Sequence, residues 1–155
     1  MRILFVCLGN ICRSPAAEGI FTHLIKQYGL ESVISCDSAG TAGYHEGQGA
    51  YPKMKKIAAQ RGYNLTSISR PIRPIHDFED FDMIIAMDDQ NFKDLTRMAT
   101  NTKMGSKICR MTDFSARYKY THIPDPYYGD SKDYELVIDL LEDACEGLIQ
   151  SLNLA

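Results

Sequence analysis

A short loop near the N-terminus carries a cysteine and an arginine whose spacing suits chemistry on phosphate. From Cys7 the chain reads Cys-Leu-Gly-Asn-Ile-Cys-Arg-Ser, which places Arg13 where a helix is predicted to begin. Gly9 and Asn10 tolerate left-handed backbone geometry, so a loop of this length can turn its N–H groups inward around an anion. Arg13 adds a planar fork for two phosphate oxygens, and the helix adds its positive N-terminal end. The loop is therefore predicted to bind phosphate.

Cys7 is the candidate nucleophile of this loop. An electropositive pocket favours the thiolate, which is the reactive form of cysteine. A thiolate beneath a bound phosphorus could attack a phosphoester and form a phosphocysteine intermediate. Ser14 could donate a hydrogen bond to the sulfur, first as nucleophile and then as leaving group. A single cysteine at a strand end is more often a small buried hydrophobe, but here every neighbouring residue type has a separate role in the same chemistry.

Short apolar runs alternate with longer segments of helical periodicity along the chain. The runs predicted as strands are Ile3–Val6, Val33–Cys36, Met83–Met87 and Lys107–Met111. The segments predicted as helices run from Ser14-Pro15 to Gly29, around Ala50–Gly62, over Asp88–Met98, and along the stripe from Val137 to Leu152. In the first helix, Ser14 is the expected N-cap and Pro15 the first helical residue.

This alternation predicts an α/β protein with a three-layer doubly wound fold, in which a four-stranded parallel sheet carries helices on both faces. No repeat, low-complexity segment or linker divides the 155 residues, so residues 1–155 are expected to form a single domain. Sites in such folds form beyond the carboxyl ends of the strands, and Cys7 stands at the end of the first one.

The composition is that of a globular protein, with 45% hydrophobic residues, 24% charged residues and a net charge of −3. The chain has no long basic run and no stretch of the ~20 apolar residues that a membrane span needs, so neither nucleic acid nor membrane is an expected partner. The five cysteines are odd in number and scattered, which argues against a disulfide framework. We therefore expect a cytoplasmic location, and a monomer or a weak homo-oligomer.

Other phosphate and metal sites find no support in the sequence. A nucleotide-binding loop of the type Gly-x4-Gly-Lys-Ser/Thr is missing. The Gly47-Gln48-Gly49 stretch begins a dinucleotide-type pattern, but Pro52 stands where the third glycine should be. No Cys-x-x-Cys pair occurs, and none of the four histidines stands at metal-ligand spacing with another ligand. We therefore expect neither a metal nor another cofactor.

Four motifs in the chain resemble those of the low molecular weight protein tyrosine phosphatases. The family signature Val-Cys-x-Gly-Asn-Ile-Cys-Arg-Ser-Pro is matched by Val6–Pro15, and its Asp-Ser-Ala-x-Thr by Asp37–Thr41. The Met-Asp step that ends its third strand is matched by Met87-Asp88, and its late Asp-Pro-Tyr-Tyr-Gly by Asp125–Gly129. The resemblance spans essentially the whole chain, and its first and last motifs are highly specific.

The resemblance implies a metal-free hydrolase that removes phosphate from the phosphotyrosine of a protein. Cys7 would be the nucleophile, Arg13 would bind the phosphate, and Asp125 would protonate the leaving phenol and later activate water. Loop support is expected from Asn10, Ser14 and Ser38. The residues expected to contact phosphate or substrate are Leu8, Gly9, Asn10, Ile11, Cys12, Ser14, Tyr44, Tyr127 and Tyr128, and Tyr44 and His45 are also candidates for specificity.

One departure from the family pattern lies near Ser67. Some members place a histidine at about this position, where it helps to hold the serine that corresponds to Ser38, so we expect the loop support to differ in this chain. Three other functions stay open. Arsenate reduction needs further cysteines, which 68–91 do not contain. Arginine phosphatases tend to have threonine where this chain has Ile11. A phospho-binding module is the third alternative, although Cys7, Arg13 and Asp125 are all present.

Overall fold

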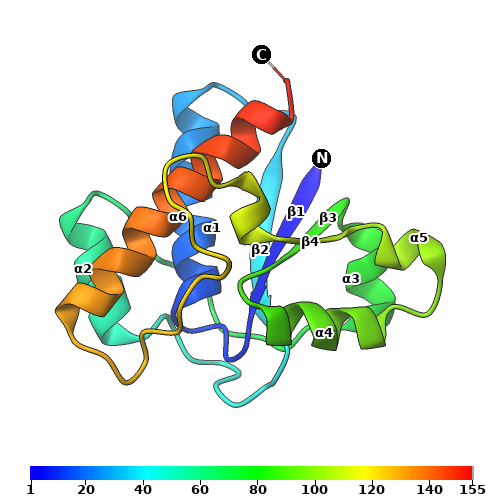
Figure 1. Ribbon diagram of the computed structural model, residues 1–155, viewed down its shortest axis with the longest axis horizontal. Helices are drawn as coiled ribbons and strands as arrows, with labels where there is room; N and C mark the ends of the chain where they lie inside the picture. The colour runs from blue at the N-terminus through cyan, green and yellow to red at the C-terminus, as the bar shows by residue number, and fades with distance from the viewer. Residues whose placement is uncertain (155) are drawn as a thin grey trace.

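A computed structural model describes residues 1–154 of the protein. Its centre is one parallel sheet whose strands lie in the order β2-β1-β3-β4 (Figure 1). The strands are β1 (Arg2–Cys7), β2 (Ser35–Gly40), β3 (Met83–Ala86) and β4 (Ile108–Arg110). The predicted four-stranded parallel sheet is thus confirmed.

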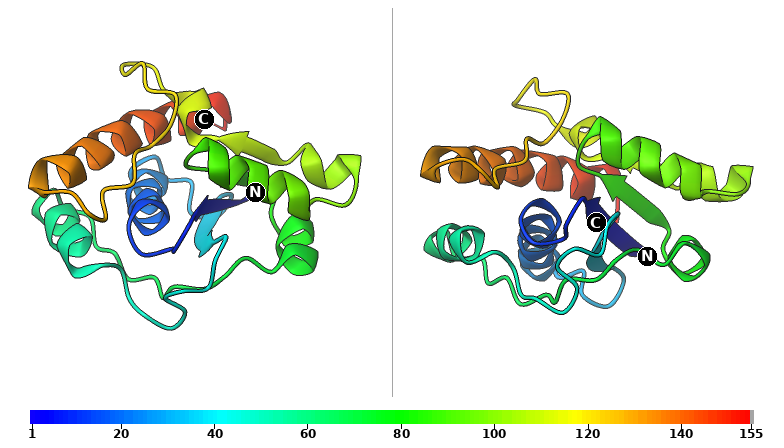
Figure 2. Two further views of the ribbon diagram at one scale, coloured as in Figure 1. Left: turned by 60° about the horizontal axis from the view of Figure 1, so that its bottom comes forward. Right: turned by 90° about the horizontal axis from the view of Figure 1, so that it is seen from below.

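Helices cover both faces of the sheet (Figure 2). One face is covered by α1 (Arg13–Gln27), the 3-10 helix η1 (Met111–Phe114) and the long α6 (Ser131–Ser151), and α2 (Pro52–Gln60) packs against α6 and α1. The other face packs against α3 (Pro74–Asp80) and α4 (Asp89–Met98), with the short α5 (Thr102–Gly105) beyond them. The three-layer architecture predicted from the alternation of strands and helices is therefore correct.

The central strand β1 shows why its sequence is apolar throughout. Ile3 and Phe5 join the core beneath α1 and α6, whereas Leu4 and Val6 join the core beneath α3 and α4. All four side chains are fully buried. A parallel strand covered on both faces has no solvent side, so it reads as a continuous hydrophobic run.

Two predicted boundaries are wrong. The second strand begins at Ser35 and continues to Gly40, whereas Val33 lies outside it and is exposed. The reason is that the polar end of this strand, including Ser38, pairs with β1 and is held by side-chain hydrogen bonds. The first helix begins at Arg13 with Cys12 as its N-cap, so Ser14 lies inside the helix and its hydroxyl is free for another partner.

The helices α3 and α5 and the 3-10 helix η1 were not predicted. Each has seven residues or fewer, which is too short to show helical periodicity. No helix among residues 1–154 has the length and apolar character to cross a bilayer.

The strand order creates a crevice at the carboxyl ends of β1 and β3. The chain leaves β1 toward β2 on one side and later enters β3 on the other side of β1. The loops after β1 and β3 therefore diverge, which is where doubly wound sheets place their sites. Cys7 ends β1, and Asp88 follows β3 directly before α4.

Candidate active site

The loop from Cys7 to Arg13 is tightly built against the end of β2. Asn10 supplies the left-handed turn with φ of 56°, whereas Gly9 does not adopt a positive φ. The closest approach comes from Gly40, where an added Cβ would lie 2.7 Å from the Leu8 carbonyl oxygen and 2.8 Å from that of Ala42. The backbone of β2 thus fixes the outer side of the loop and leaves no room for a side chain at Gly40.

The predicted support residues meet in one buried hydrogen-bond network. The Cys7 Sγ lies 3.0 Å from the Ser14 Oγ. The Asn10 Nδ2 donates to the Ser14 Oγ at 2.8 Å and to the Ser38 Oγ at 3.0 Å. The Asn10 Oδ1 accepts from the Arg70 backbone N–H at 3.0 Å. The structure therefore brings Asn10, Ser14 and Ser38 together behind the Cys7 sulfur.

Arg13 is buried and held by groups that come much later in the chain. Its Nη1 donates to the Asp88 Oδ2 at 2.7 Å and to the Ile123 carbonyl oxygen at 3.0 Å. Its Nη2 lies 3.7 Å from the Asp125 Oδ2. Burial acts to lower the pKa of Arg13, but Cys7, Asp88 and Asp125 outweigh burial and raise it. Arg13 is therefore a fixed cation beside Cys7.

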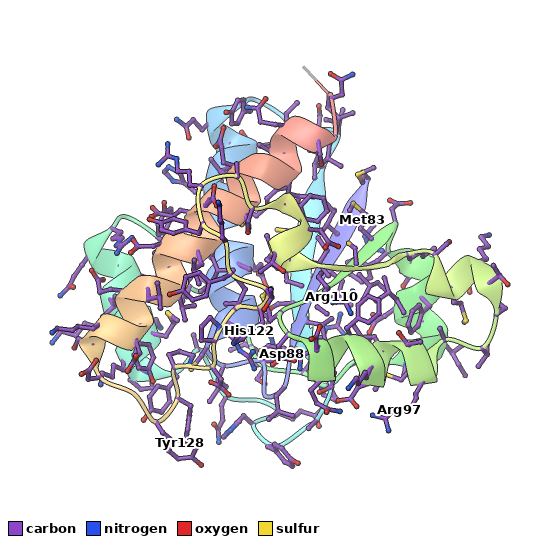
Figure 3. The ribbon with its side chains drawn as sticks, in the orientation of Figure 1. Met83, Asp88, Arg97, Arg110, His122 and Tyr128 are labelled. Carbon is purple, nitrogen blue, oxygen red and sulfur yellow. The ribbon has the colours of Figure 1, made fainter. Side chains whose placement is uncertain are left out.

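Asp125 lies at the mouth of the site with about half of its side chain exposed, 48% by area. Its Oδ1 accepts a hydrogen bond from the Tyr127 backbone N–H at 3.1 Å, which orients the carboxyl group. Asp88, in contrast, is the N-cap of α4 and accepts a hydrogen bond from the Asn91 backbone N–H (Figure 3). The two carboxylates near Arg13 therefore have different surroundings, one open to solvent and one fixed at a helix end.

A cavity of about 340 Å³ opens above the loop. It is lined by nearly all of the predicted contact residues together with His45, namely Cys7, Leu8, Gly9, Ile11, Cys12, Arg13, Tyr44, His45, Asp125, Tyr127 and Tyr128. Asn10 and Ser14 are buried behind this lining and support it from below. Cys7, Arg13 and Asp125 thus face the same space.

Aromatic side chains form the outer walls of the cavity. Tyr128 is almost fully exposed and lies at the outer edge of the molecule (Figure 3), and Tyr44 is also exposed. Tyr127 is half-buried and packs edge-on against Tyr128 with ring centroids 4.9 Å apart. Tyr51 packs against Tyr127 from behind, with ring centroids 5.0 Å apart. The cavity therefore has apolar, aromatic sides above a polar floor.

Cys12 is the second thiol that lines the cavity. Burial, helped by the nearby Cys7 and Asp125, raises the pKa of Cys12 to about 12. Cys12 therefore stays a neutral thiol at physiological pH. This leaves Cys7, which contacts the Ser14 hydroxyl, as the candidate nucleophile of the loop.

Several residues of the site were not singled out from the sequence. Asp88 anchors Arg13, the Ser69 Oγ donates to the Gly9 carbonyl oxygen at 3.0 Å, and Glu18 accepts from the Ser38 Oγ. Asp88 appeared in the sequence only as part of the Met87-Asp88 step at the end of a buried strand, with no role assigned to its side chain. Ser69 and Glu18 gave no signal, because their contacts depend on how distant segments meet. Within residues 1–154, no three His, Cys, Asp or Glu side chains are grouped to hold a metal ion.

Comparisons with known proteins agree on one family. The family model described as low molecular weight phosphotyrosine protein phosphatase matches residues 2–155. A crystal structure of a protein tyrosine phosphatase from Entamoeba histolytica is 50% identical, covers 99% of this chain and 97% of its own, and superposes with a TM-score of 0.96.

Two bacterial relatives are similar over nearly their whole length. The low molecular weight protein-tyrosine-phosphatase YfkJ of Bacillus subtilis is 40% identical over 99% of this chain and 96% of its own. Its crystal structure superposes with a TM-score of 0.90. A low molecular weight protein-tyrosine-phosphatase of Streptomyces coelicolor is 35% identical over 98% of this chain and 93% of its own.

Proposed function

Because this chain belongs to the low molecular weight phosphotyrosine protein phosphatase family and is a protein-tyrosine phosphatase, we propose that Cys7, Arg13 and Asp125 carry out its reaction. The observation that supports this assignment is the single cavity that all three residues line. A nucleophile, a fixed cation and a solvent-accessible carboxyl group are the parts that phosphoester hydrolysis requires.

In the first step, the Cys7 thiolate attacks the phosphorus of the substrate. A sulfur–phosphorus bond forms while the bond between phosphorus and the tyrosine oxygen breaks. Asp125, in its protonated form, gives its proton to the departing phenolate, which leaves as neutral tyrosine. Arg13 and the loop N–H groups stabilise the charge that the phosphoryl oxygens carry during transfer. The products are the dephosphorylated tyrosine and a phosphocysteine.

In the second step, water attacks the phosphocysteine. The Asp125 carboxylate left by the first step accepts a proton from this water, so the same residue acts first as acid and then as base. The sulfur–phosphorus bond breaks, phosphate leaves, and Cys7 returns as a thiolate. Ser14, 3.0 Å from the sulfur, can stabilise that leaving thiolate by donating a hydrogen bond from its hydroxyl group. No step needs a metal ion.

The substrate we propose is the phosphotyrosine of a protein. Its phenyl ring would enter between Tyr44 and the Tyr127–Tyr128 pair, where aromatic faces can pack against it. Ile11 is buried at the floor and presents an apolar surface to the ring. We also propose that residues 1–155 form one domain that acts as a monomer or a weak homo-oligomer. All five cysteines are free, which fits a reducing compartment such as the cytoplasm.

The test is phosphate release from phosphotyrosine, phosphoarginine and phosphoserine peptides with a metal chelator present. We expect phosphotyrosine to be preferred and Cys7→Ser to abolish turnover. Cys109→Ser serves as the matched control, because Cys109 lies on the edge strand β4 and does not line the cavity, and it should keep full activity. A preference for phosphoarginine would contradict the role given to Ile11, and turnover by Cys7→Ser would contradict the role given to Cys7.

A further inference from the structure

The hydrogen-bond network behind Cys7 extends to Glu18 on α1. The Ser38 Oγ donates to the Glu18 Oε1 at 2.6 Å, and Ser38 is also bonded to Asn10. Glu18 is half-buried and lies outside the cavity above Cys7. It lines a second cavity of about 240 Å³, which is also lined by Ser67, the position where some family members have a histidine. A continuous path of hydrogen bonds therefore links this second cavity to the nucleophile.

The direction of each hydrogen bond in this path follows from counting donors. The Asn10 Oδ1 accepts from the Arg70 N–H, so its Nδ2 must face the two serines. Both Nδ2 protons are then used, and both serine oxygens act as acceptors toward Asn10. Each serine hydroxyl has one remaining proton to donate.

The Ser38 hydroxyl donates its hydrogen bond to the Glu18 carboxylate, because an ionised carboxylate can only accept hydrogen bonds. For Ser14, the available acceptors are the Cys7 Sγ at 3.0 Å and the Ala39 carbonyl oxygen at a much longer 3.4 Å. An ionised Cys7 has no proton to donate, so the Ser14 proton points at the sulfur when Cys7 is a thiolate. The hydrogen bonds run from the Arg70 N–H to Asn10 and then branch. One branch passes through Ser38 to the Glu18 carboxylate, and the other passes through Ser14 to the Cys7 sulfur.

We propose that Glu18 is a positioning residue that holds Ser38 and Asn10 so that the Ser14 hydroxyl donates a hydrogen bond to the Cys7 thiolate. This inference rests on the proposed role of Cys7. Residue 67 is a serine in this chain, so no imidazole is available there to hold Ser38. Glu18 provides the hydrogen-bond acceptor that the Ser38 hydroxyl needs. Without that acceptor, the Ser38 hydroxyl would be left with an unused proton in a buried place, and its grip on Asn10 would loosen.

The surroundings of Glu18 make it a half-buried anion with several charged neighbours. Burial raises the pKa of Glu18, and Asp37 raises it further, whereas the Ser38 hydrogen bond and Arg70 lower it. His23 and Lys26, from the same helix, line the second cavity with it.

A positioning role and a purely electrostatic role of Glu18 predict opposite signs. A negative charge near Cys7 disfavours the thiolate through space, so removing that charge alone would make the thiolate easier to form. Removing the acceptor of Ser38 loosens the Ser14 hydrogen bond to sulfur, so the thiolate would become harder to form. The direction of the change in thiolate formation thus distinguishes the two.

The experiment compares Glu18→Gln with Glu18→Met by measuring the alkylation rate of Cys7 against pH, read by mass spectrometry of its peptide. Glutamine keeps an oxygen acceptor without charge, and methionine keeps the volume and helix propensity without a strong acceptor. We expect Glu18→Gln to stay within about twofold of the wild type. Glu18→Met should shift the half-maximal pH upward and slow alkylation about three- to tenfold below it, as for the loss of one hydrogen bond.

Matched controls separate this role from general damage. Glu31→Gln removes an exposed carboxylate just after α1 and should leave the profile unchanged. In a Ser38→Ala background the link is already cut, so Glu18→Met should add less than about twofold. If Glu18→Met does not fold, Glu18→Ala replaces it. A downward or absent pH shift in a folded variant, or an equal effect in the Ser38→Ala background, would overturn the proposal. Failure of the proposed function would instead show as wild-type turnover that does not depend on Cys7.

Discussion

At the scale of single residues, two carboxylates share the Arg13 guanidinium unequally. Asp88 forms a close ion pair with Arg13 at 2.7 Å, whereas Asp125 lies 3.7 Å away and is half exposed. A short, partly buried pair fixes a side chain in place, and a loose, exposed one can be replaced by an incoming phosphate. Asp88 therefore serves to hold Arg13, and Asp125 is the carboxyl group that is free for proton transfer.

This division predicts the kinetics of Asp125→Asn. The amide cannot give a proton to the leaving phenolate, so turnover of phosphotyrosine should fall about 100- to 1000-fold. A substrate with a strongly acidic phenol leaves without help, so its turnover should fall by less than about tenfold. Steady-state kinetics on aryl phosphates of graded phenol acidity measures the difference. Asp80→Asn, an exposed control, should change neither rate, and equal losses for all leaving groups would contradict the role of Asp125.

At the scale of elements, the end of β2 shapes the phosphate loop. Gly40 pairs with Cys7 at the last position of the β1–β2 ladder. The carbonyl oxygens of Leu8 and Ala42 lie on either side of the place that a Cβ would take. Both neighbours are backbone atoms, so they can move only if the loop moves.

We therefore expect Gly40→Ala to distort the site more than it destabilises the fold. Phosphotyrosine turnover should fall at least tenfold, and the unfolding free energy should fall by about 1–3 kcal/mol, as for an overpacked position. Steady-state kinetics measures the loss of turnover, and urea unfolding measures the loss of stability. Inhibition by inorganic phosphate shows whether the loop still binds the anion. Gly105→Ala is the matched control, since a Cβ at Gly105 meets nothing within 4 Å. Normal phosphate binding by Gly40→Ala would show that the loop tolerates the added methyl group.

The elements differ in how well their sequences predict them. Apolar runs such as Ile3–Val6 and Met83–Met87 identified β1 and β3, because a doubly covered strand has no polar side. The polar stretch Ser35–Gly40 was partly missed as a strand, because its hydrogen-bond partners come from α1 and the phosphate loop. In the site, the Cys7–Arg13 motif was local and readable. The contacts of Glu18, Ser69 and Asp88 depend on tertiary packing, so spacing could not reveal them.

At the scale of the whole molecule, buried thiols couple the fold to alkaline pH. Burial raises the pKa of Cys12, Cys36 and Cys109 to about 12 from an ordinary value of 9.0, and it raises that of Cys145 well above 9.0. Below pH ~8 these thiols are almost entirely neutral in both the folded and the unfolded state and hardly affect stability. Above that pH the unfolded chain releases their protons and the folded chain keeps them, so stability falls as pH rises toward about 12.

We expect the unfolding free energy to fall by about 5 kcal/mol between about pH 8 and pH 10 under reducing conditions, roughly 1.4 kcal/mol for each of these cysteines. Urea titrations at each pH measure this loss. In Cys109→Ala the loss should be smaller by about 1.4 kcal/mol, whereas the slope of stability with pH between about pH 6 and pH 8 should match the wild type. A loss at high pH that is the same in both proteins would contradict the role of the thiols.

The partners of Arg13 also have a consequence for the order in which the chain is made. The N-terminal part of a chain leaves the ribosome first, and folding during synthesis starts from this end. The loop of Cys7 and its supports through Arg70 emerge early, but Asp88, Ile123 and Asp125, which surround Arg13, emerge much later. A growing chain therefore contains the residues of its anion cradle before it contains Asp125, the proposed proton donor. Full turnover of phosphotyrosine has to wait until the last quarter of the chain has been synthesised and Asp125 has reached Arg13.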